Sequence, residues 1–295
     1  MAELLSGKAV AEAMNARLAE RVTALKARGV TPKLAIVRCG EDPSDLSYER
    51  SACVRAALIG VEAEVFALPR DVSRETLIGQ IRAINADEAI HGALLFRPLP
   101  EPLKPFQSEI CNALEPAKDV DGMTDLSCAG VFEGRDDLGF PPCTPQACVE
   151  MLDHYGIDCT GRKVTVIGRS LVVGKPLAMM LMGKNATVTV CHTRTADVAA
   201  EARAANILVS AAGKLKSLKR EYVRPGQVVI DVSTNWDPDK ANSRGGRGAI
   251  AGDAVFEEVE PVVAAITPVP GGVGAVTTSV LIGHVVEAAE RQMPV

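Results

Sequence analysis

Short apolar runs alternate with amphipathic segments along most of the chain. The runs rich in β-branched residues are 33–38, 63–68, 92–96, 163–168, 186–191, 207–212 and 227–232. Helical patterns occur at 9–27, 44–60, 73–85, 144–156, 175–183 and 198–205. Because apolar strands that alternate with amphipathic helices form parallel sheets covered on both faces, the pattern predicts an α/β protein.

Turn-rich stretches divide this pattern. The segment 132–145 separates two groups of strands and is the expected domain boundary, with a helix starting at Thr144-Pro145 and ending at Gly156. The polar, glycine-rich segment 235–250 is expected to be a surface loop of the second domain. A last helix is expected from about Thr277 to Gln292.

Composition narrows the class of protein. The 295 residues carry 32 Lys and Arg against 37 Asp and Glu, a net charge of −5 without blocks of like charge, which argues against a nucleic-acid partner. The chain shows no secretory signal and no apolar run long enough to span a bilayer, so we expect no membrane association and a cytoplasmic protein. Eight cysteines without a C-x-x-C pair are expected to be reduced thiols, mostly in the core, and no metal site is expected.

A strand, a glycine turn and a helix follow one another in 163–181. Gly168 ends the strand, and the next helix starts near Gly174. This arrangement places a pyrophosphate at a helix N-terminus, although Ser170 stands at the second glycine of the G-x-G-x-x-G pattern. Taken alone, the turn is equally compatible with a structural role.

The end of the next strand bears on the choice of cofactor. An NAD site usually has a carboxylate there, whereas this chain has Cys191-His192-Thr193-Arg194. The hydroxyl of Thr193 and the guanidinium groups of Arg194 and Arg169 suit a ribose phosphate. They favour NADP, and NAD is the alternative cofactor. The alternative is that both arginines are solvated loop charges, and His192 is expected to make a loop or ribose contact.

The segment 266–290 has two prolines and three glycines before a threonine-rich helix start. Its glycines let the backbone approach a ligand closely, and Thr277 or Thr278 can cap the helix. An inter-domain loop fits this composition equally well.

Together these segments resemble the methylenetetrahydrofolate dehydrogenase/cyclohydrolase family. The matching motifs are Tyr48 with Gly60, PLP (98–100), KDVDG (118–122), CTP (143–145), GRSLVVGKP (168–176), CHTRT (191–195), AAGK (211–214), Asn235, GD (252–253) and TPVPGGVG (267–274). The resemblance implies two domains with a cleft between them and a homodimer. It implies a three-layer αβα folate-binding catalytic domain, 1–140 plus 277–295, and a Rossmann-type NAD(P)-binding domain, 141–276.

The resemblance also implies site residues. Tyr48 would stack on the folate ring system and Asp121 would accept hydrogen bonds from the pterin amino group and ring N–H, the alternatives being an ordinary helix tyrosine and a turn residue. The other implied substrate contacts are Leu95, Pro270, Gly271 and Gly272. The implied cofactor contacts are Gly168, Arg169, Ser170, Gly174, Thr193, Arg194, Gly213, Ser233, Thr234 and Thr277. Lys118 is expected to be a surface lysine.

Two polar residues of the family pattern are replaced. Ala52 stands where the pattern Tyr-x-x-x-Lys has the lysine of the cyclohydrolase step. The family run V-Q-L-P-L-P, whose glutamine hydrogen-bonds that lysine, reads Leu95-Phe96-Arg97-Pro98-Leu99-Pro100 here, so Phe96 stands at the glutamine. Arg55 lies on the same helix face as Ala52, but a guanidinium does not transfer protons as an amine does. Ser233-Thr234 and Ala275-Val276 replace Gly-Ile and Pro-Met.

These replacements predict an NADP-preferring methylenetetrahydrofolate dehydrogenase of one-carbon folate metabolism with weak or absent cyclohydrolase activity. Hydride transfer needs orientation rather than a protein acid or base, whereas hydrolysis needs proton transfer. A bifunctional enzyme is the first alternative. A catalytically silent paralogue that binds nucleotide or folate is the second.

Overall fold

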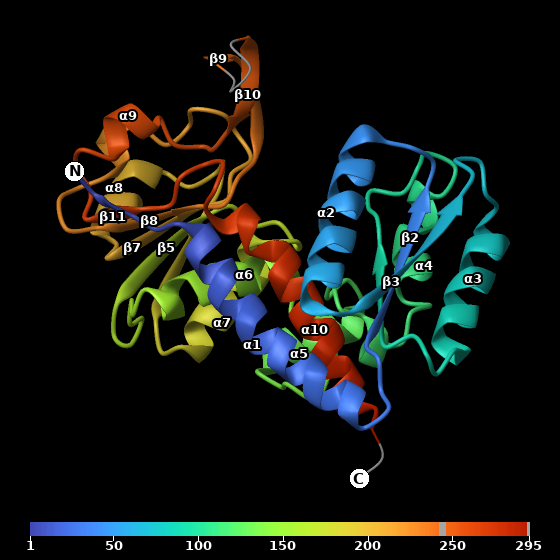
Figure 1. Cartoon of the computed structure of the whole chain (residues 1–295). Helices are drawn as coiled ribbons and strands as arrows, with labels where there is room; N and C mark the ends of the chain where they lie inside the picture. Colours follow the sequence, from blue (N-terminus) through green and yellow to red (C-terminus); the bar gives the residue numbers. More distant parts are fainter. Residues whose placement is uncertain (242–245, 294–295) are drawn as a thin grey trace. The chain divides into compact units, whose positions relative to one another are not determined.

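A computed structural model describes residues 1–241 and 246–293 of the chain (Figure 1). Its internal contacts group the chain into two compact units. One unit contains residues 12–143 and 278–295, and the other contains residues 1–11 and 144–277. Each unit is described by itself below.

The unit of residues 12–143 and 278–295 is built on a three-stranded parallel sheet. Its strand order is β3 (Glu62–Leu68), β2 (Lys33–Cys39), β4 (Gly92–Leu95). The central strand β2 is buried along Leu34 to Val37, which explains its unbroken apolar run. The helices that include residues of this unit are α1 (Gly7–Ala27), α2 (Pro43–Ile59), α3 (Arg74–Ala86), α4 (Gln107–Cys111), α5 (Asp125–Glu133) and α10 (Thr277–Arg291), with short 3₁₀ turns at Lys104–Phe106 and Pro116–Lys118.

Helix α2 is defined at both ends by local sequence. The Asp42 side chain accepts a hydrogen bond from the Ser44 backbone N–H at 2.9 Å, and Pro43 occupies the first turn. Gly60 ends the helix with a φ of 94°, which a side-chain-bearing residue adopts only with strain. Helix α2 therefore begins and ends within one residue of its predicted limits, 44–60.

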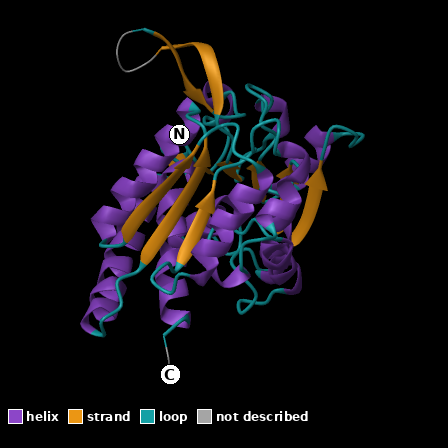
Figure 2. Cartoon of the chain, turned by 90° about the vertical axis from the view of Figure 1, so that its right-hand side faces the viewer, coloured by secondary structure: helices purple, strands orange, loops and turns teal. Residues whose placement is uncertain are grey.

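The second unit contains a six-stranded parallel sheet with helices on both faces (Figure 2). Its strand order is β1 (Glu3–Leu4), β11 (Ala265–Ile266), β8 (Val228–Asp231), β7 (Ile207–Ser210), β5 (Lys163–Ile167), β6 (Thr187–Cys191). The helices are α6 (Cys143–His154), α7 (Gly174–Gly183), α8 (Val198–Ala204) and α9 (Phe256–Val259), with 3₁₀ turns at Arg220–Tyr222 and Val273–Ala275. This arrangement is the predicted α/β fold.

The strand order has a switch point between β5 and β7. The chain adds β6 on one side of β5 and then β7 and β8 on the other. Right-handed crossovers in opposite directions place α7 and α8 on opposite faces of the sheet (Figure 1). In such sheets ligands bind at the carboxyl ends of the strands that flank the switch point.

The expectation of a loop at 235–250 was wrong. The described part of this segment forms an antiparallel hairpin of β9 (Asn235–Ala241) and β10 (Arg247–Ala251), while residues 242–245 lie outside the described residues. Asp237 is only 4% exposed and forms an ion pair with Lys216 at 2.8 Å, whereas its neighbour Trp236 is 65% exposed. Because a charge faces inward and an aromatic ring faces outward, the segment lacks the usual strand signature.

Residues 1–11 group with the second unit. Strand β1 pairs in parallel with β11, through Glu3 with Ala265 and Leu4 with Ile266. This division differs from the predicted domains, which assigned these residues to the folate-binding domain. A two-residue strand at a sheet edge gives no periodicity from which its partner can be predicted.

Candidate functional site

Two aromatic rings meet at the carboxyl end of the three-stranded sheet. Tyr48 lies in the second turn of α2, and Phe96 directly follows β4. Their ring centroids are 5.9 Å apart with the planes at 88°, an edge-to-face contact. Ala52, one helical turn after Tyr48, is fully buried. The structure therefore brings Tyr48 and Phe96 into contact, while Ala52 is buried on the same face of α2 as Tyr48 and Leu95 is buried in β4.

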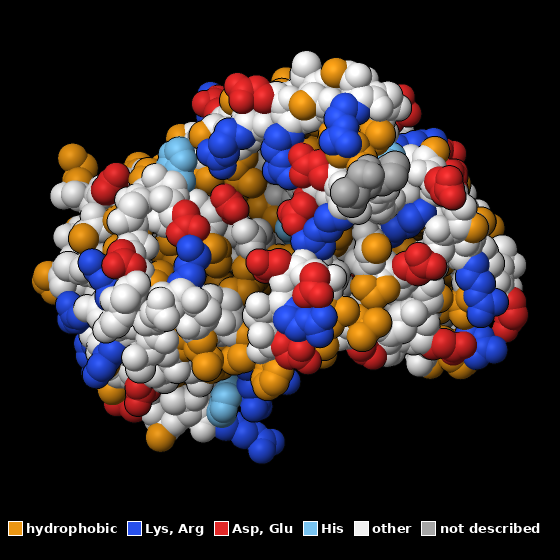
Figure 3. All heavy atoms as spheres, turned by 90° about the horizontal axis from the view of Figure 1, so that it is seen from below, with side chains coloured by type: hydrophobic (Ala, Val, Ile, Leu, Met, Phe, Trp, Pro, Cys, Tyr) orange, Lys and Arg blue, Asp and Glu red, His pale blue; other side chains and the backbone are white. Residues whose placement is uncertain are grey.

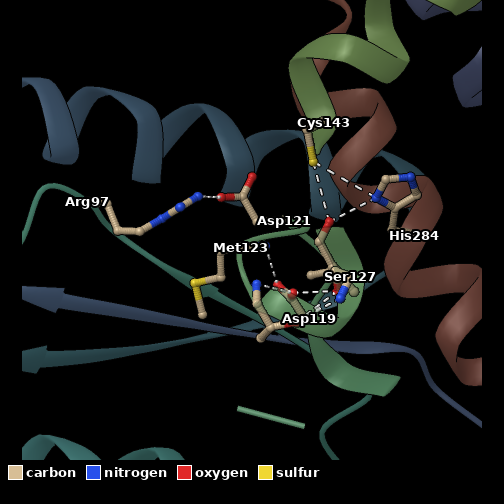
Figure 4. Close-up of polar contacts among 9 residues, drawn as sticks. Arg97, Asp119, Asp121, Met123, Ser127, Cys143 and His284 are labelled. Atoms are coloured by element: carbon tan, nitrogen blue, oxygen red, sulfur yellow. Dashed lines mark hydrogen bonds and ion pairs between the residues drawn. The ribbon is translucent and has the colours of Figure 1, made fainter. Parts of the chain in front are cut away.

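Arg97, which follows Phe96, places a positive charge against Asp121, the carboxylate predicted to bind the pterin. Arg97 donates from Nη2 to Oδ2 of Asp121 at 2.8 Å (Figure 4), and the two side chains are 24% and 20% exposed. Burial raises the pKa of Asp121, and the positive charge of Arg97 opposes that rise. Asp121 is thus already engaged by a guanidinium in this structure.

The turn that carries Asp121 is fixed by a second carboxylate. Asp119 is fully buried and accepts hydrogen bonds from Met123 N at 3.0 Å, Thr124 N at 2.8 Å and Ser127 Oγ at 2.6 Å (Figure 4). These bonds join the turn to the start of α5, whose N-cap is Thr124. The sequence analysis assigned no role to Asp119, although an aspartate five positions before the N-cap threonine of a helix was the available signal.

The expectation that Lys118 is a surface lysine was wrong. Its side chain is buried, and Nζ donates to the carbonyl oxygens of Ile84, Asn85 and Asp87 at 2.7–2.9 Å. These carbonyls end α3, where a cation satisfies groups without a helical partner. Burial lowers the pKa of Lys118. Its role is to connect the Asp121 turn to α3.

A buried cysteine and histidine hold the other side of this turn. His284 of α10 lies with Nδ1 2.8 Å from the Val120 carbonyl oxygen, and the Cys143 thiol donates to the same oxygen at 3.4 Å (Figure 4). Burial lowers the pKa of His284 and raises the pKa of Cys143 well above its usual value. A neutral imidazole and a protonated thiol are the forms that donate to a carbonyl, so this pair is structural rather than nucleophilic.

A cavity lies at the same edge of the sheet. Its volume is about 540 Å³, and its lining includes Gly40, Arg70, Pro98, Leu99 and Lys104. Ligand pockets commonly have about 300–1,000 Å³. Tyr48 and Asp121 do not belong to its lining, so the cavity neighbours the predicted residues rather than containing them.

The glycine turn of the second unit has the geometry of a phosphate cradle. Gly168 has a φ of 128°, and a Cβ there would collide with the Ala211 carbonyl oxygen. A Cβ on Gly174 would collide with the Gly168 carbonyl oxygen, so both positions require glycine. Ser170 tightens the turn by accepting from Val173 N at 3.1 Å through Oγ. The turn lies at the carboxyl end of β5 and leads into the N-terminus of α7, where the helix dipole favours an anion.

The residues after β6 present positive charge to solvent. Arg169, Thr193 and Arg194 are all exposed. His192 shapes this loop, because its backbone N–H donates to Thr195 Oγ1 at 2.9 Å and its Nδ1 accepts from Arg194 N at 3.1 Å. His192 is therefore a turn residue here, and within the described part of the chain neither arginine side chain has a hydrogen-bond partner, so both can meet an anion.

Asp253 is a hydrogen-bond centre that the sequence analysis did not assign. It is fully buried at the start of the segment after β10, and five groups donate to its carboxylate. The donors are Ser210 Oγ, Ala212 N, Lys214 N, Ser233 Oγ and Asn235 Nδ2, at 2.8–3.1 Å. Asp253 thus fixes the loops after β7 and β8 together, and its place in the quoted GD motif was the available signal.

Ser233 is a predicted cofactor contact that is hydrogen-bonded to another, Gly213. It is buried and accepts a hydrogen bond from Gly213 N at 3.0 Å while donating to Asp253, whereas Thr234 is exposed. Thr277 starts α10 and donates to the Gly274 carbonyl oxygen at 3.1 Å. The Ser-Thr pair therefore has one structural member and one that faces solvent.

The proline-glycine segment 270–272 packs against the N-terminus of the chain. The Gly271 carbonyl oxygen accepts from Gly7 N at 2.8 Å, and a Cβ on Gly7 would collide with Gly272 O. Pro270 is exposed beside them. The start of α1 thus fixes the backbone of this segment within its unit.

Metal binding, membrane insertion and nucleic-acid binding can each be judged from the described side chains and helices. Within residues 1–241 and 246–293, no three His, Cys, Asp or Glu side chains gather as a metal site, and no helix has the length and apolarity to cross a bilayer. The eight cysteines are free thiols, five of them buried. On the face shown in Figure 3, acidic and basic side chains are intermixed. That face is not the single-sign surface of a general nucleic-acid binder.

Two family models match the chain. The tetrahydrofolate dehydrogenase/cyclohydrolase catalytic domain matches residues 5–121, and the NAD(P)-binding domain of the same family matches residues 142–293. Together they cover most of the sequence.

Named relatives agree with these matches. The bifunctional protein FolD of Carboxydothermus hydrogenoformans is 49% identical over 290 residues, covering 98% of each chain. The crystal structure of bifunctional FolD from Campylobacter jejuni has a TM-score of 0.92 at 33% identity, covering 99% of this chain and 100% of that one. The FolD structure of Trypanosoma brucei, complexed with NADP and an inhibitor, has a TM-score of 0.90 at 33% identity, covering 98% of each.

Proposed function

The chain belongs to the tetrahydrofolate dehydrogenase/cyclohydrolase family, and from this premise we propose that it oxidises methylenetetrahydrofolate to methenyltetrahydrofolate. The observation that carries the proposal is the turn from Gly168 to Gly174, where collisions exclude a side chain at each of the two glycines. Such a turn lets a pyrophosphate approach the backbone at the start of α7. These residues fit a nicotinamide dinucleotide.

NADP is the proposed cofactor. Arg169, Thr193 and Arg194 are exposed near the carboxyl ends of β5 and β6, and no carboxylate occupies the position that binds ribose hydroxyls in NAD sites. Arginine is well suited to phosphate because its planar N–H groups form paired hydrogen bonds. The other proposed contacts are Gly168, Ser170, Gly174, Gly213, Ser233, Thr234 and Thr277.

The proposed folate contacts begin with an aromatic ring and a carboxylate. Tyr48 presents a ring for stacking, and Asp121 presents carboxylate oxygens to pterin N–H groups. Leu95, Pro270, Gly271 and Gly272 complete the proposed set. When bound, NADP would supply the hydride acceptor, and Tyr48 and Asp121 would hold the folate in position. Because the product cation is stabilised by its two nitrogens, orientation is the main contribution, which reaches about 7–11 kcal/mol in well-aligned systems.

The cyclohydrolase step has two candidate outcomes. The names of the relatives support a bifunctional enzyme. Ala52 and Phe96 support a dehydrogenase with weak cyclohydrolase activity, since a buried methyl group and an aromatic ring replace the lysine and the glutamine that would serve proton transfer. We propose the dehydrogenase activity for both candidates, and the hydrolysis rate distinguishes them.

The proposed setting is folate one-carbon metabolism in the cytoplasm, with tetrahydrofolate derivatives as ligands and a homodimer as the assembly. The relatives named above support the ligands. Sedimentation of the purified chain tests the dimer.

One assay tests the function. The purified protein is incubated with methylenetetrahydrofolate and either NADP or NAD, while reduced cofactor and methenyltetrahydrofolate are followed separately. Reduced cofactor in proportion to methenyl product is the expected result. Its absence with both cofactors, in a protein that still binds folate or nucleotide, indicates the silent paralogue instead.

Asp121→Ala tests the folate end of the site. We expect weaker folate binding with unchanged affinity for NADP, measured by titration of each ligand. Unchanged folate affinity contradicts the assignment of Asp121 to the pterin.

A further inference from the structure

Arg97 is a charged residue at a position where the family pattern has leucine. The run V-Q-L-P-L-P of that pattern reads Leu-Phe-Arg-Pro-Leu-Pro in residues 95–100. The guanidinium does not extend into solvent, since the Arg97 side chain is 24% exposed and forms an ion pair with Asp121 at 2.8 Å. A cation has therefore been added to the group that is proposed to bind the pterin.

The pair leaves hydrogen-bonding capacity on both partners. A guanidinium has five N–H donors, and among the described residues Arg97 uses Nη2 alone. A carboxylate accepts about four hydrogen bonds, and Oδ2 of Asp121 receives the Arg97 bond. Donors of Arg97 and acceptors of Asp121 thus lie side by side at the end of β4 (Figure 4).

Both apolar and charged groups surround this pair, and besides burial the buried carboxylate of Asp119 lies close enough to raise the pKa of Asp121. Phe96 precedes Arg97 and contacts Tyr48, and Leu95 is buried. A half-buried ion pair in such surroundings contributes little net stability, because desolvation offsets the attraction between the charges. The small net gain in stability leaves room for a role of Arg97 in ligand binding, since most of its donors are unused among the described residues.

We propose that Arg97 and Asp121 jointly recognise the amide edge of the pterin ring. Arg97 donates to the 4-carbonyl oxygen while Asp121 accepts from the adjacent ring N–H and the 2-amino group. This inference rests on the proposed function, and it adds a substrate-binding residue that makes the site selective for 4-oxo over 4-amino pteridines. A 4-amino pteridine turns a donor toward the donors of Arg97 and has no hydrogen on the ring nitrogen that faces Asp121, so the contribution of Arg97 is the part of the preference that its variants lose.

The test compares the affinities of tetrahydrofolate and its 4-amino-4-deoxy analogue by anaerobic titration. The unaltered protein is expected to bind tetrahydrofolate at least about tenfold more tightly, because the analogue loses hydrogen bonds to both Arg97 and Asp121. In Arg97→Leu this preference is expected to fall by about tenfold or more. The ratio of two dissociation constants does not depend on the fraction of protein that is folded.

A second variant and a control complete the design. Arg97→Gln keeps a donor for Asp121 but no charged donor for the carbonyl oxygen, so its preference should also fall if Arg97→Leu does not fold. Arg21→Leu breaks an ion pair of the same unit, with Glu290 at 2.6 Å, and should leave the preference unchanged.

The outcomes separate this inference from the proposed function. Equal affinity of the unaltered protein for the two ligands overturns the inference, as does an unchanged preference in both Arg97 variants. In either case methylenetetrahydrofolate turnover still supports the dehydrogenase. Tighter binding of both ligands by Arg97→Leu shows that Arg97 covers Asp121 instead of assisting it. Absence of tetrahydrofolate binding overturns both proposals.

Discussion

The ring of Phe96 meets the ring of Tyr48 edge to face, with centroids 5.9 Å apart. A glutamine in place of Phe96 would offer an amide to a lysine on α2, but α2 has the fully buried Ala52 at that position. The two replacements put a buried methyl group and an aromatic ring at the positions of the polar pair in the family pattern. This relationship gives the first prediction.

Methenyltetrahydrofolate should accumulate as the product of the unaltered protein. Loss of a positioned proton-transfer group typically costs about 10²–10⁴-fold in rate. Ala52→Lys alone should not restore hydrolysis, because Phe96 offers the ammonium no hydrogen bond and an apolar wall disfavours its charge. Ala52→Lys with Phe96→Gln should restore part of it. The measurement is hydrolysis of purified methenyltetrahydrofolate, corrected for the spontaneous rate.

Phe96→Gln alone is the matched control for the double variant and should stay inactive in hydrolysis. A hydrolysis rate of the unaltered protein comparable to its own dehydrogenase turnover supports the bifunctional candidate and contradicts this prediction.

Removal of the cofactor arginines should change cofactor preference. Arg169→Ala or Arg194→Ala should raise KM for NADP about tenfold and KM for NAD less than about threefold, the difference expected for one charged hydrogen bond to phosphate. Steady-state kinetics with each cofactor measure both constants. Arg162→Ala is the control, because Arg162 precedes β5 and so lies at the amino end of that strand, away from the glycine turn at its carboxyl end. Equal effects on NADP and NAD would show that neither arginine binds the ribose phosphate.

Asp231 should make stability depend on pH. Burial raises its pKa to about 6, above the value of about 3.9 in an unfolded chain. The folded state therefore binds more protons between these values, so this group adds stability as the pH falls. From pH 7 to pH 5 the gain in free energy of unfolding should be about 1 kcal/mol.

Urea unfolding of the unaltered protein and of Asp231→Asn at both pH values isolates this contribution, since the variant keeps the other titrating groups. The gain should be absent from the variant. An identical pH dependence of the two proteins refutes the assignment to Asp231.

Asp253→Ala should destabilise the second unit strongly. It removes the acceptor of five hydrogen bonds and leaves buried donors unsatisfied, so the free energy of unfolding should fall by at least about 3 kcal/mol. Asp239→Ala, at an exposed position of β9, should change it by less than about 0.5 kcal/mol. Denaturant unfolding measures both. Similar losses in the two variants would show that Asp253 does not hold the loops together.

Local sequence determined much of this protein. The apolar runs and helical periodicities located seven strands and seven helices because the period of side-chain exposure is a local property of each element. The turn at Gly168 and Gly174 was predicted for the same reason, since its backbone geometry requires glycine whatever lies beyond it. The replacements at Ala52 and Phe96 were also visible, because they stand inside motifs that are otherwise in register.

Contacts between distant residues were decided by the tertiary structure alone. Lysine is usually a surface residue, and Lys118 is buried only because α3 ends where its ammonium can reach three carbonyl groups. Asp253 becomes a hydrogen-bond centre because the loops after β7 and β8 meet it from elsewhere in the chain. The ion pair of Arg97 with Asp121 joins residues 24 positions apart. A charge carries no periodicity, so its partner is set by the fold that surrounds it.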